Sequence, residues 1–165
     1  MKTMNKINKL TEQIIGLAIK VHKTLGPGFV ERIYQRAMYL ELKNSKLRFE
    51  REKKISVYYN KALLGYEKTD FIINNQIILE LKCVAEISDI HKAQVLSYLK
   101  AAQTPVGLIL NFARPKLEIK RLIDSSAASA GSASLRLQKN IQEQIPNRKM
   151  QPQKHGIEQK HRIET

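Results

Sequence analysis

The sequence predicts an α/β domain, and three observations support this fold class. Apolar residues recur at helical spacing in two N-terminal stretches and again near residues 90–102. Two β-branched runs joined by an asparagine-rich turn predict a hairpin between these helices. The continuous apolar run Val106–Leu110 is typical of a strand that is covered on both faces. A chain of 165 residues, 42% of them hydrophobic, can form one such domain with an appendage.

Two helices are expected first, over residues 10–25 and 29–44. Asn8 or Thr11 can cap the first helix, and a Gly-Pro-Gly sequence follows its end. Glu31 lies in the first turn of the second helix, where a carboxylate interacts favourably with the helix dipole. The apolar positions of the second helix are Ile33, Ala37, Leu40 and Leu42, with Tyr34 and Met38 alongside.

The later elements follow from alternation and capping signals. Residues 47–59 alternate enough to form one strand, and Gly65 marks a bulge in the segment that leads into the hairpin. Ser88 can cap a third helix over residues 90–102. Residues 117–123 are expected to form a last strand at the edge of the sheet, with exposed basic side chains.

The central hairpin, residues 70–82, carries three charged groups in an apolar setting. Glu80 and Lys82 point to the same face because strand side chains alternate. Asp70 lies opposite Glu80 only if the hairpin is centred on Asn75, since a register slip of one residue would turn it to the other face. A charge within an apolar strand is costly unless it is paired or holds a metal ion. The three groups therefore form either a salt-bridged strand end or a site for a divalent cation.

The chain is strongly basic, with 29 Lys and Arg against 15 Asp and Glu and a net charge of +14. Residues 1–123 hold 22 of the basic and 11 of the acidic side chains, so most of the charge belongs to the folded part. Such a balance favours a polyanionic partner, above all nucleic acid, although a merely basic surface is the alternative.

Composition also bounds the environment and the domain organisation. Cys83 is the single cysteine, which excludes an intrachain disulfide and a cysteine-rich zinc site. The apolar runs are too short to span a membrane and no signal-peptide pattern is present, so a cytoplasmic protein without membrane contact is expected. Residues 1–123 are predicted to form the domain, and residues 124–165 a low-complexity, basic and disordered tail.

Residues 28–34, Gly-Phe-Val-Glu-Arg-Ile-Tyr, and the ordered set of charged residues behind them resemble the GxxExxY proteins of the PD-(D/E)XK nuclease superfamily. The resemblance covers roughly residues 8–123. It implies a restriction-endonuclease-like αβββαβ core with a central mixed sheet, preceded by one N-terminal helix. It also implies a metal-dependent nuclease that hydrolyses phosphodiester bonds of nucleic acid, with DNA as the expected substrate. The residues that carry it, beyond those of the first motif, are Lys68 to Phe71, Glu80 to Lys82, Gln94, Tyr98, Asn111 and Phe112.

The resemblance assigns roles to individual side chains. Asp70 and Glu80 would hold Mg²⁺ or Mn²⁺, with Glu31 as a further ligand directly or through water. Lys82 would orient the attacking water or stabilise charge on the phosphate, and Gln94 would fix that water or Lys82. The nucleic acid would be contacted by Lys68, Lys92 and Tyr98.

Two other functions remain open at this level. A nuclease fold can bind nucleic acid or a protein partner without cutting, and a basic chain can be a subunit of a larger nucleoprotein assembly. A homodimer would suit an enzyme that cuts two strands. Divalent-metal binding separates the catalytic from the binding hypothesis.

Overall fold

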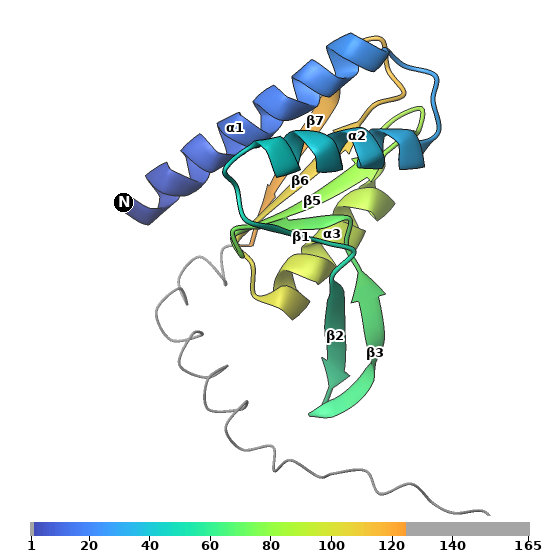
Figure 1. The fold of residues 1–165 in the computed structure, drawn as a ribbon. Helices are drawn as coiled ribbons and strands as arrows, with labels where there is room; N and C mark the ends of the chain where they lie inside the picture. Colours follow the sequence, from blue (N-terminus) through green and yellow to red (C-terminus); the bar gives the residue numbers. More distant parts are fainter. Residues whose placement is uncertain (1, 125–165) are drawn as a thin grey trace, which may run out of the picture. The chain divides into compact units, whose positions relative to one another are not determined.

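The computed structural model describes residues 2–124, in which helices cover both faces of a five-stranded sheet (Figure 1). The helices are α1 (Lys2–Leu25), α2 (Glu31–Asn44) and α3 (Asp89–Ala102). The strands are β1 (Phe49–Arg51), β2 (Lys54–Tyr59), β3 (Ala62–Lys68), β4 (Phe71–Ile73), β5 (Ile77–Lys82), β6 (Val106–Asn111) and β7 (Glu118–Ile123). The fold class predicted from the sequence is confirmed.

The central sheet has the strand order β1-β4-β5-β6-β7 and is mixed. Strands β5 and β6 run parallel, and the other neighbouring pairs of this sheet are antiparallel. The run α2-β1-β4-β5-α3-β6 gives the expected αβββαβ order, with α1 before it and β7 added at one edge. Strands β2 and β3 form a separate two-stranded ribbon between β1 and β4 in the sequence.

The β4–β5 hairpin has the register that the sequence analysis required. Ile73 pairs with Ile77, so the loop of three residues is centred on Asn75. Asn74 and Asn75 adopt positive φ angles of 51° and 55°, a conformation that asparagine tolerates better than most residues. Continuing this register by one residue places Asp70, which precedes β4, opposite Glu80 of β5.

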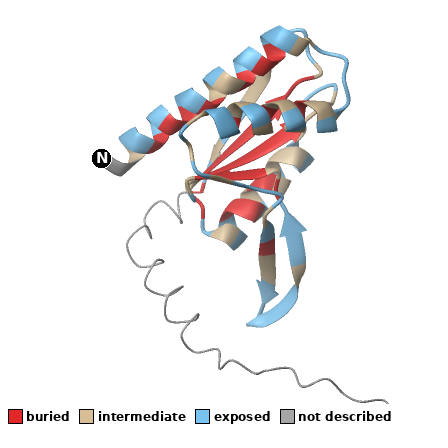
Figure 2. Cartoon of the chain, viewed as in Figure 1, coloured by how far each residue is buried: buried red, intermediate tan, exposed pale blue. Residues whose placement is uncertain are grey.

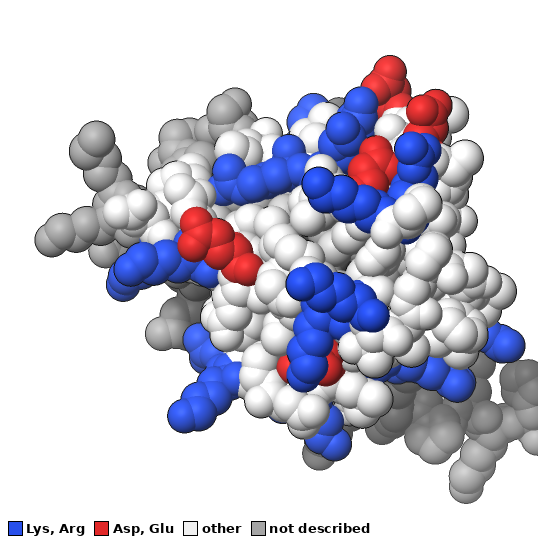
Figure 3. Space-filling model, turned by 90° about the horizontal axis from the view of Figure 1, so that it is seen from above, with Lys and Arg blue, Asp and Glu red and all other residues white. Residues whose placement is uncertain are grey.

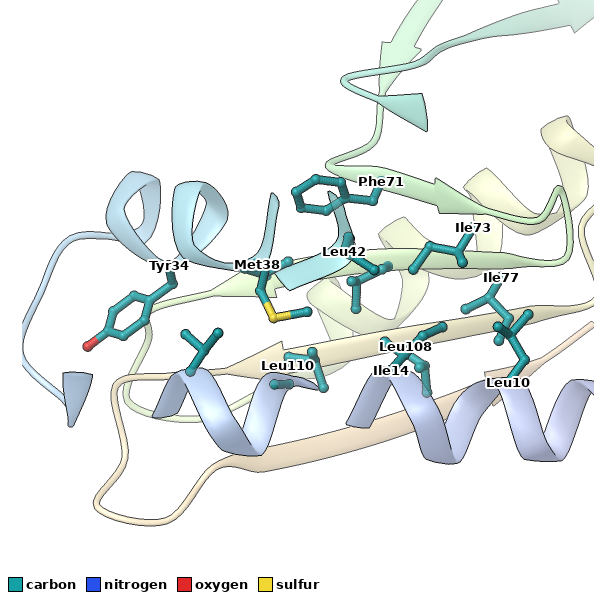
Figure 4. Packing of buried hydrophobic residues seen from close by; sticks show 14 of the residues in the cluster. Leu10, Ile14, Tyr34, Met38, Leu42, Phe71, Ile73, Ile77, Leu108 and Leu110 are labelled. Carbon is teal, nitrogen blue, oxygen red and sulfur yellow. The ribbon is translucent and has the colours of Figure 1, made fainter. Parts of the chain in front are cut away.

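The helix α1 begins at Lys2, so the predicted start near residues 8–11 is wrong. Its buried face extends back through Ile7, which is only 3% exposed and belongs to the same cluster as the sheet residues beneath it. Asn8 accepts a hydrogen bond from the Arg121 guanidinium at 2.9 Å and caps nothing. Figure 4 shows Leu10 and Ile14 of α1 pointing toward Leu108 and Leu110 of the sheet.

The second helix buries Tyr34, Met38 and Leu42 against the same face of the sheet (Figure 4). Leu40, expected among its apolar positions, is 57% exposed instead. Tyr34, Met38 and Leu42 recur every four residues, so they form one stripe of the helix and Leu40 lies off it. The helix begins at Glu31, two residues later than predicted.

The single strand predicted over residues 47–59 is wrong, because the chain forms β1 and β2 in two different sheets. The break lies at Glu52, whose φ angle is +51°. The backbone N–H of Glu52 donates to the Asp70 carbonyl at 2.9 Å, which fixes the bend beside the start of β4. The bulge expected at Gly65 is present, since the β2–β3 register shifts next to the Val57–Gly65 pair.

The helix α3 covers the opposite face of the sheet and begins with a capping box between Ser88 and His91. It lies close to β6 because Gly107 leaves room for it. A Cβ atom at Gly107 would lie 2.5 Å from the Val95 side chain of α3. Close packing here positions Gln94 and Tyr98, which lie on the same helix.

The last strand lies at the sheet edge, as predicted, with Lys120 and Arg121 exposed. Asp124, the first residue of the predicted tail, is buried, and its backbone N–H donates to the Pro105 carbonyl at 3.0 Å. The remainder of that tail, residues 125–165, lies outside the described residues. No helix in the described part of the chain is long and apolar enough to cross a membrane.

We expect Gly107→Ala to destabilise the fold by about 1–3 kcal/mol, because the branched Val95 side chain cannot withdraw without repacking. Thermal unfolding should show a lower melting temperature. Gly16→Ala is the matched control: an added Cβ on this exposed α1 residue meets nothing within 4 Å. Because alanine favours helix over glycine, the control should gain up to about 1 kcal/mol. Equal effects of the two substitutions would contradict the close α3–β6 packing.

Candidate active site

The candidate site is built around two carboxyl groups that the hairpin register brings together. Asp70 immediately precedes β4, and Glu80 lies near the end of β5, where it is only 6% exposed. The pKa of Asp70 is raised to about 7, chiefly by burial and then by the negative charge of Glu80. Burial also raises the pKa of Glu80, while its bond to Lys82 acts in the opposite direction. Two acidic groups of this kind need a proton or a cation between them to be stable together.

Asp70 is held in place through both of its carboxyl oxygens. Its Oδ2 accepts a hydrogen bond from the Leu81 backbone N–H at 2.7 Å. Its Oδ1 accepts one from the Gln35 side-chain amide at 2.8 Å. The same Gln35 amide lies 3.4 Å from the Glu31 carboxylate, one turn earlier on α2. One strand and one helix therefore orient this carboxyl group.

Glu31, the first residue of α2, also faces this group of side chains. Its negative charge raises the pKa of Asp70 and of Glu80, although less than burial does. Burial and then Glu31 raise the pKa of the neighbouring Cys83 thiol to about 11. Cys83 packs against the apolar core, so it is a neutral structural residue.

Glu80 has one satisfied and one unsatisfied oxygen. Its Oε1 forms an ion pair with Lys82 Nζ at 2.9 Å, and both side chains are largely buried, 7% and 15% exposed. Its Oε2 is buried and has no hydrogen-bond partner among the described protein atoms. A buried acceptor without a partner is uncommon and points to a group that completes its coordination.

The α3 residues Gln94 and Tyr98 contact each other, as their spacing predicted. The Gln94 amide donates to the Tyr98 hydroxyl at 2.8 Å, and this hydroxyl lies 3.4 Å from the Glu67 carboxylate of β3. Burial chiefly, and then the charge of Glu80, raise the pKa of Tyr98. Tyr98 is therefore close enough to Glu80 to be affected by its charge, and Gln94 is bonded to Tyr98.

The two predicted nucleic-acid-binding lysines lie at the surface. Lys68 pairs with Glu52 at 3.2 Å, with both side chains more than half exposed. Lys92 pairs with Asp89 at 2.8 Å, which raises the Lys92 pKa. The structure thus gathers Glu31, Asp70, Glu80, Lys82 and Tyr98 and leaves these two lysines outside that group.

The turn before α2 explains how Glu31 is positioned. Gly26 and Gly28 adopt positive φ angles of 68° and 112°, which other residues rarely adopt. The Tyr34 hydroxyl donates to the Gly26 carbonyl at 2.6 Å and accepts from the Phe29 N–H at 3.3 Å. The Tyr34 ring stacks on Phe112 with 4.6 Å between centroids, so the beginning of α2 is fixed to the end of β6.

Gln35, which joins α2 to Asp70, was not among the predicted site residues. The available signal was its spacing of four residues from Glu31, which places both side chains on one face of the helix.

Comparison with known protein families identifies a superfamily for this chain. Residues 8–122 match the family model of the PD-(D/E)XK nuclease superfamily, and the chain belongs to that superfamily. A solved structure described as the crystal structure of SSO0001 is 14% identical, with a TM-score of 0.49 over 72% of this chain and 69% of that chain. A search of curated proteins found no match.

The buried Asp70 carboxyl group predicts an unusual pH dependence of stability. Because its pKa rises on folding from 3.8 to about 7, its favourable contribution is complete below about pH 4 and is lost as pH rises through 7. In a chelator, Asp70→Asn should therefore be more stable than wild type above pH 7, by on the order of a few kcal/mol. Thermal melts between pH 4 and 8 should show this advantage growing and then levelling off.

Asp89→Asn is the control, because the pKa of Asp89 is lowered whereas that of Asp70 is raised. Lys92 lowers the pKa of this exposed carboxylate, so removing its charge should bring no gain above pH 7. A uniform loss of stability in Asp70→Asn across the pH range would show that the ionised form is the one the fold favours.

Proposed function

We propose that the chain is a metal-dependent nuclease that hydrolyses phosphodiester bonds, with DNA as the substrate. The observation that carries this proposal is the buried Oε2 atom of Glu80, which lacks a protein partner beside a second carboxyl group. A bound cation would satisfy this atom and offset the repulsion between Asp70 and Glu80.

The donor set suits Mg²⁺ or Mn²⁺. Carboxylate oxygens are their preferred protein ligands, and Mg²⁺ usually keeps several waters and needs only one or two carboxylates. Among the described residues, no three Asp, Glu, His or Cys side chains converge on one point. We therefore assign direct contact to Asp70 and Glu80, and an indirect role through water to Glu31. A bound ion would polarise the phosphate of the substrate and activate a water molecule for attack.

Lys82 has the position of an electrostatic catalyst. Its ion pair with Glu80, at 2.9 Å, holds the ammonium group beside the carboxyl pair. Glu80 can keep this contact through Oε1 while Oε2 binds a cation. The ammonium group then donates to a phosphate oxygen and stabilises the charge that develops there.

The remaining assigned residues act on the substrate. Tyr98 accepts a hydrogen bond from Gln94, and the charge of Glu80 acts on its hydroxyl group. This hydroxyl group can donate a hydrogen bond to a phosphate or to the attacking water. Lys68 and Lys92 form exposed ion pairs, which solvent and salt screen strongly. A phosphate group can therefore replace their carboxylate partners at little cost.

We also propose membership of the GxxExxY group within the superfamily. Each named residue of the motif has a role in this structure: Gly28 adopts a positive φ angle, Glu31 faces the carboxyl pair and Tyr34 anchors the turn.

Metal binding and cleavage provide the test. By calorimetry, wild type should bind Mn²⁺, whereas Asp70→Asn and Glu80→Gln should lose this binding because each removes a carboxylate ligand. Lys82→Met should retain metal binding and lose most cleavage, roughly 100-fold or more, because it removes charge stabilisation alone. Cleavage is measured on single-stranded, duplex, flap and four-way-junction DNA, with RNA alongside.

The matched control is Glu12→Gln, which removes an exposed carboxylate on α1 and should bind and cut as wild type does. If wild type binds no divalent ion and cuts no substrate, the catalytic proposal fails and a binding module with a nuclease fold remains. If trace cutting persists undiminished in Glu80→Gln, the activity comes from a contaminant.

A further inference from the structure

The β2–β3 ribbon extends away from the central sheet, and most of its surface is open to solvent (Figures 1 and 2). Ile55 is the one buried residue of its two strands. Ile55 packs with Val95 and Tyr98 of α3, so this residue marks the inner face of the ribbon. The opposite face, turned away from α3, is called here the outer face.

The outer face carries both aromatic and basic side chains. Residues paired across the ribbon share a face, which assigns six residues to it. They are Lys54 with Lys68, Ser56 with Tyr66, and Tyr58 with Leu63. The two tyrosines are 62% and 60% exposed, and Leu63 is 46% exposed. Apolar surface gathered in this way on a protruding element commonly marks a binding site.

The combination of tyrosines with a pair of lysines at the base of the ribbon indicates which partner fits. Lys54 Nζ lies over the Tyr66 ring, 5.9 Å from the ring centre, so a positive charge and an aromatic ring meet on this face. Aromatic rings stack on unpaired bases while lysines contact phosphates, the combination that proteins use to bind single strands.

The base of the ribbon adjoins the candidate active site. Lys68, at the end of β3, precedes Asp70 by two residues. Glu67 of the inner face is the acceptor near the Tyr98 hydroxyl, at 3.4 Å. The base of the ribbon, where Lys54 pairs with Lys68, is therefore close along the chain to the carboxyl pair.

We propose that the outer face of the ribbon binds a single-stranded segment of nucleic acid, by stacking of bases on Tyr58 and Tyr66 and by phosphate contacts from Lys54 and Lys68. The connection of this segment to the carboxyl pair rests on the proposed nuclease function. The stacking itself depends only on the ribbon.

Fluorescence anisotropy of the full chain with a labelled oligothymidylate tests this, in EDTA so that no cleavage occurs. Tyr58→Ala and Tyr66→Ala should each weaken binding roughly fivefold or more, the lower range for loss of one stacked base. Tyr58→Phe should bind as wild type because it keeps the ring. Lys54→Gln should reduce the slope of log affinity against log salt by about 0.7, one phosphate contact on a single strand.

The matched control is Tyr59→Ala, since Tyr59 is 66% exposed and next to Tyr58 but lies on the other side of the strand. Unchanged affinity in Tyr58→Ala and Tyr66→Ala, or an equal loss in Tyr59→Ala, would overturn the proposal. Duplex DNA that binds as tightly as the single strand, with the same loss in both tyrosine variants, would also overturn the proposal. A wild-type dimer that Tyr58→Ala converts to a monomer would show instead that the outer face binds a second copy of the chain.

The same assay separates this proposal from the nuclease proposal. Glu12→Gln, at an exposed α1 residue outside both proposed sites, should bind the oligothymidylate in EDTA as well as wild type does, because it changes no ribbon residue. If ribbon substitutions weaken binding while wild type neither binds Mn²⁺ nor cuts, the ribbon proposal stands and the nuclease proposal fails. If cutting is confirmed but the ribbon substitutions have no effect on affinity, the nuclease proposal stands and the ribbon proposal fails.

Discussion

The candidate site depends on the register of one short hairpin. Ile73 pairs with Ile77, and this pairing sends alternate residues of β4 and β5 to the two cores on either side of the sheet. Asp70 and Glu80 meet because the same alternation continues back past the start of β4. A slip of one residue would send the side chains of one strand to the opposite core and separate the carboxyl groups. The burial of the hairpin thus enforces the meeting of two acidic groups that would otherwise repel each other.

The rest of the site consists of elements that hold this acidic pair from several sides. Gln35 of α2 and the Leu81 N–H bond the Asp70 carboxylate, and Lys82 balances part of the charge. Asn111, at the end of β6, bonds both backbone groups of Val84 and so fixes the loop after β5. The charge pattern of the face formed by α1 and α2 is different: Figure 3 shows Lys and Arg side chains there among fewer acidic ones. A basic exterior around an acidic pair suits a polyanion that must approach a cation.

Local patterns predicted most of the fold, and they failed where tertiary contacts decide. The hairpin register, the Ser88 cap and the edge strand β7 each follow from residues within a short window. The break at Glu52 was not predictable in this way, because a glutamate gives no signal for a positive φ angle, and the bend is fixed by the distant Asp70 carbonyl. The start of α1 was misplaced for a related reason, since burial against the sheet extends the helix beyond its polar caps.

Among the candidate site residues, the motif located the carboxyl groups and Lys82, but not their hydrogen bonds. Gln35 has no distinguishing chemistry in the sequence, and its role appears only when α2 is packed beside β4 and β5. Conversely, Lys68 and Lys92 resemble substrate contacts in the sequence, although each forms an ion pair with a neighbouring acid at the surface. Exposed charges take partners that spacing alone does not specify.

The bend at Glu52 gives the ribbon a mechanical relation to the carboxyl pair. Two backbone bonds cross its base: the Glu52 N–H donates to the Asp70 carbonyl, and the Thr69 N–H donates to the Lys53 carbonyl at 3.2 Å. Asp70 thus bonds in two directions: its carbonyl accepts from the base of the ribbon, and its side chain accepts from β5. The base of the ribbon and the Asp70 carboxyl group are therefore not positioned independently, because one residue joins them.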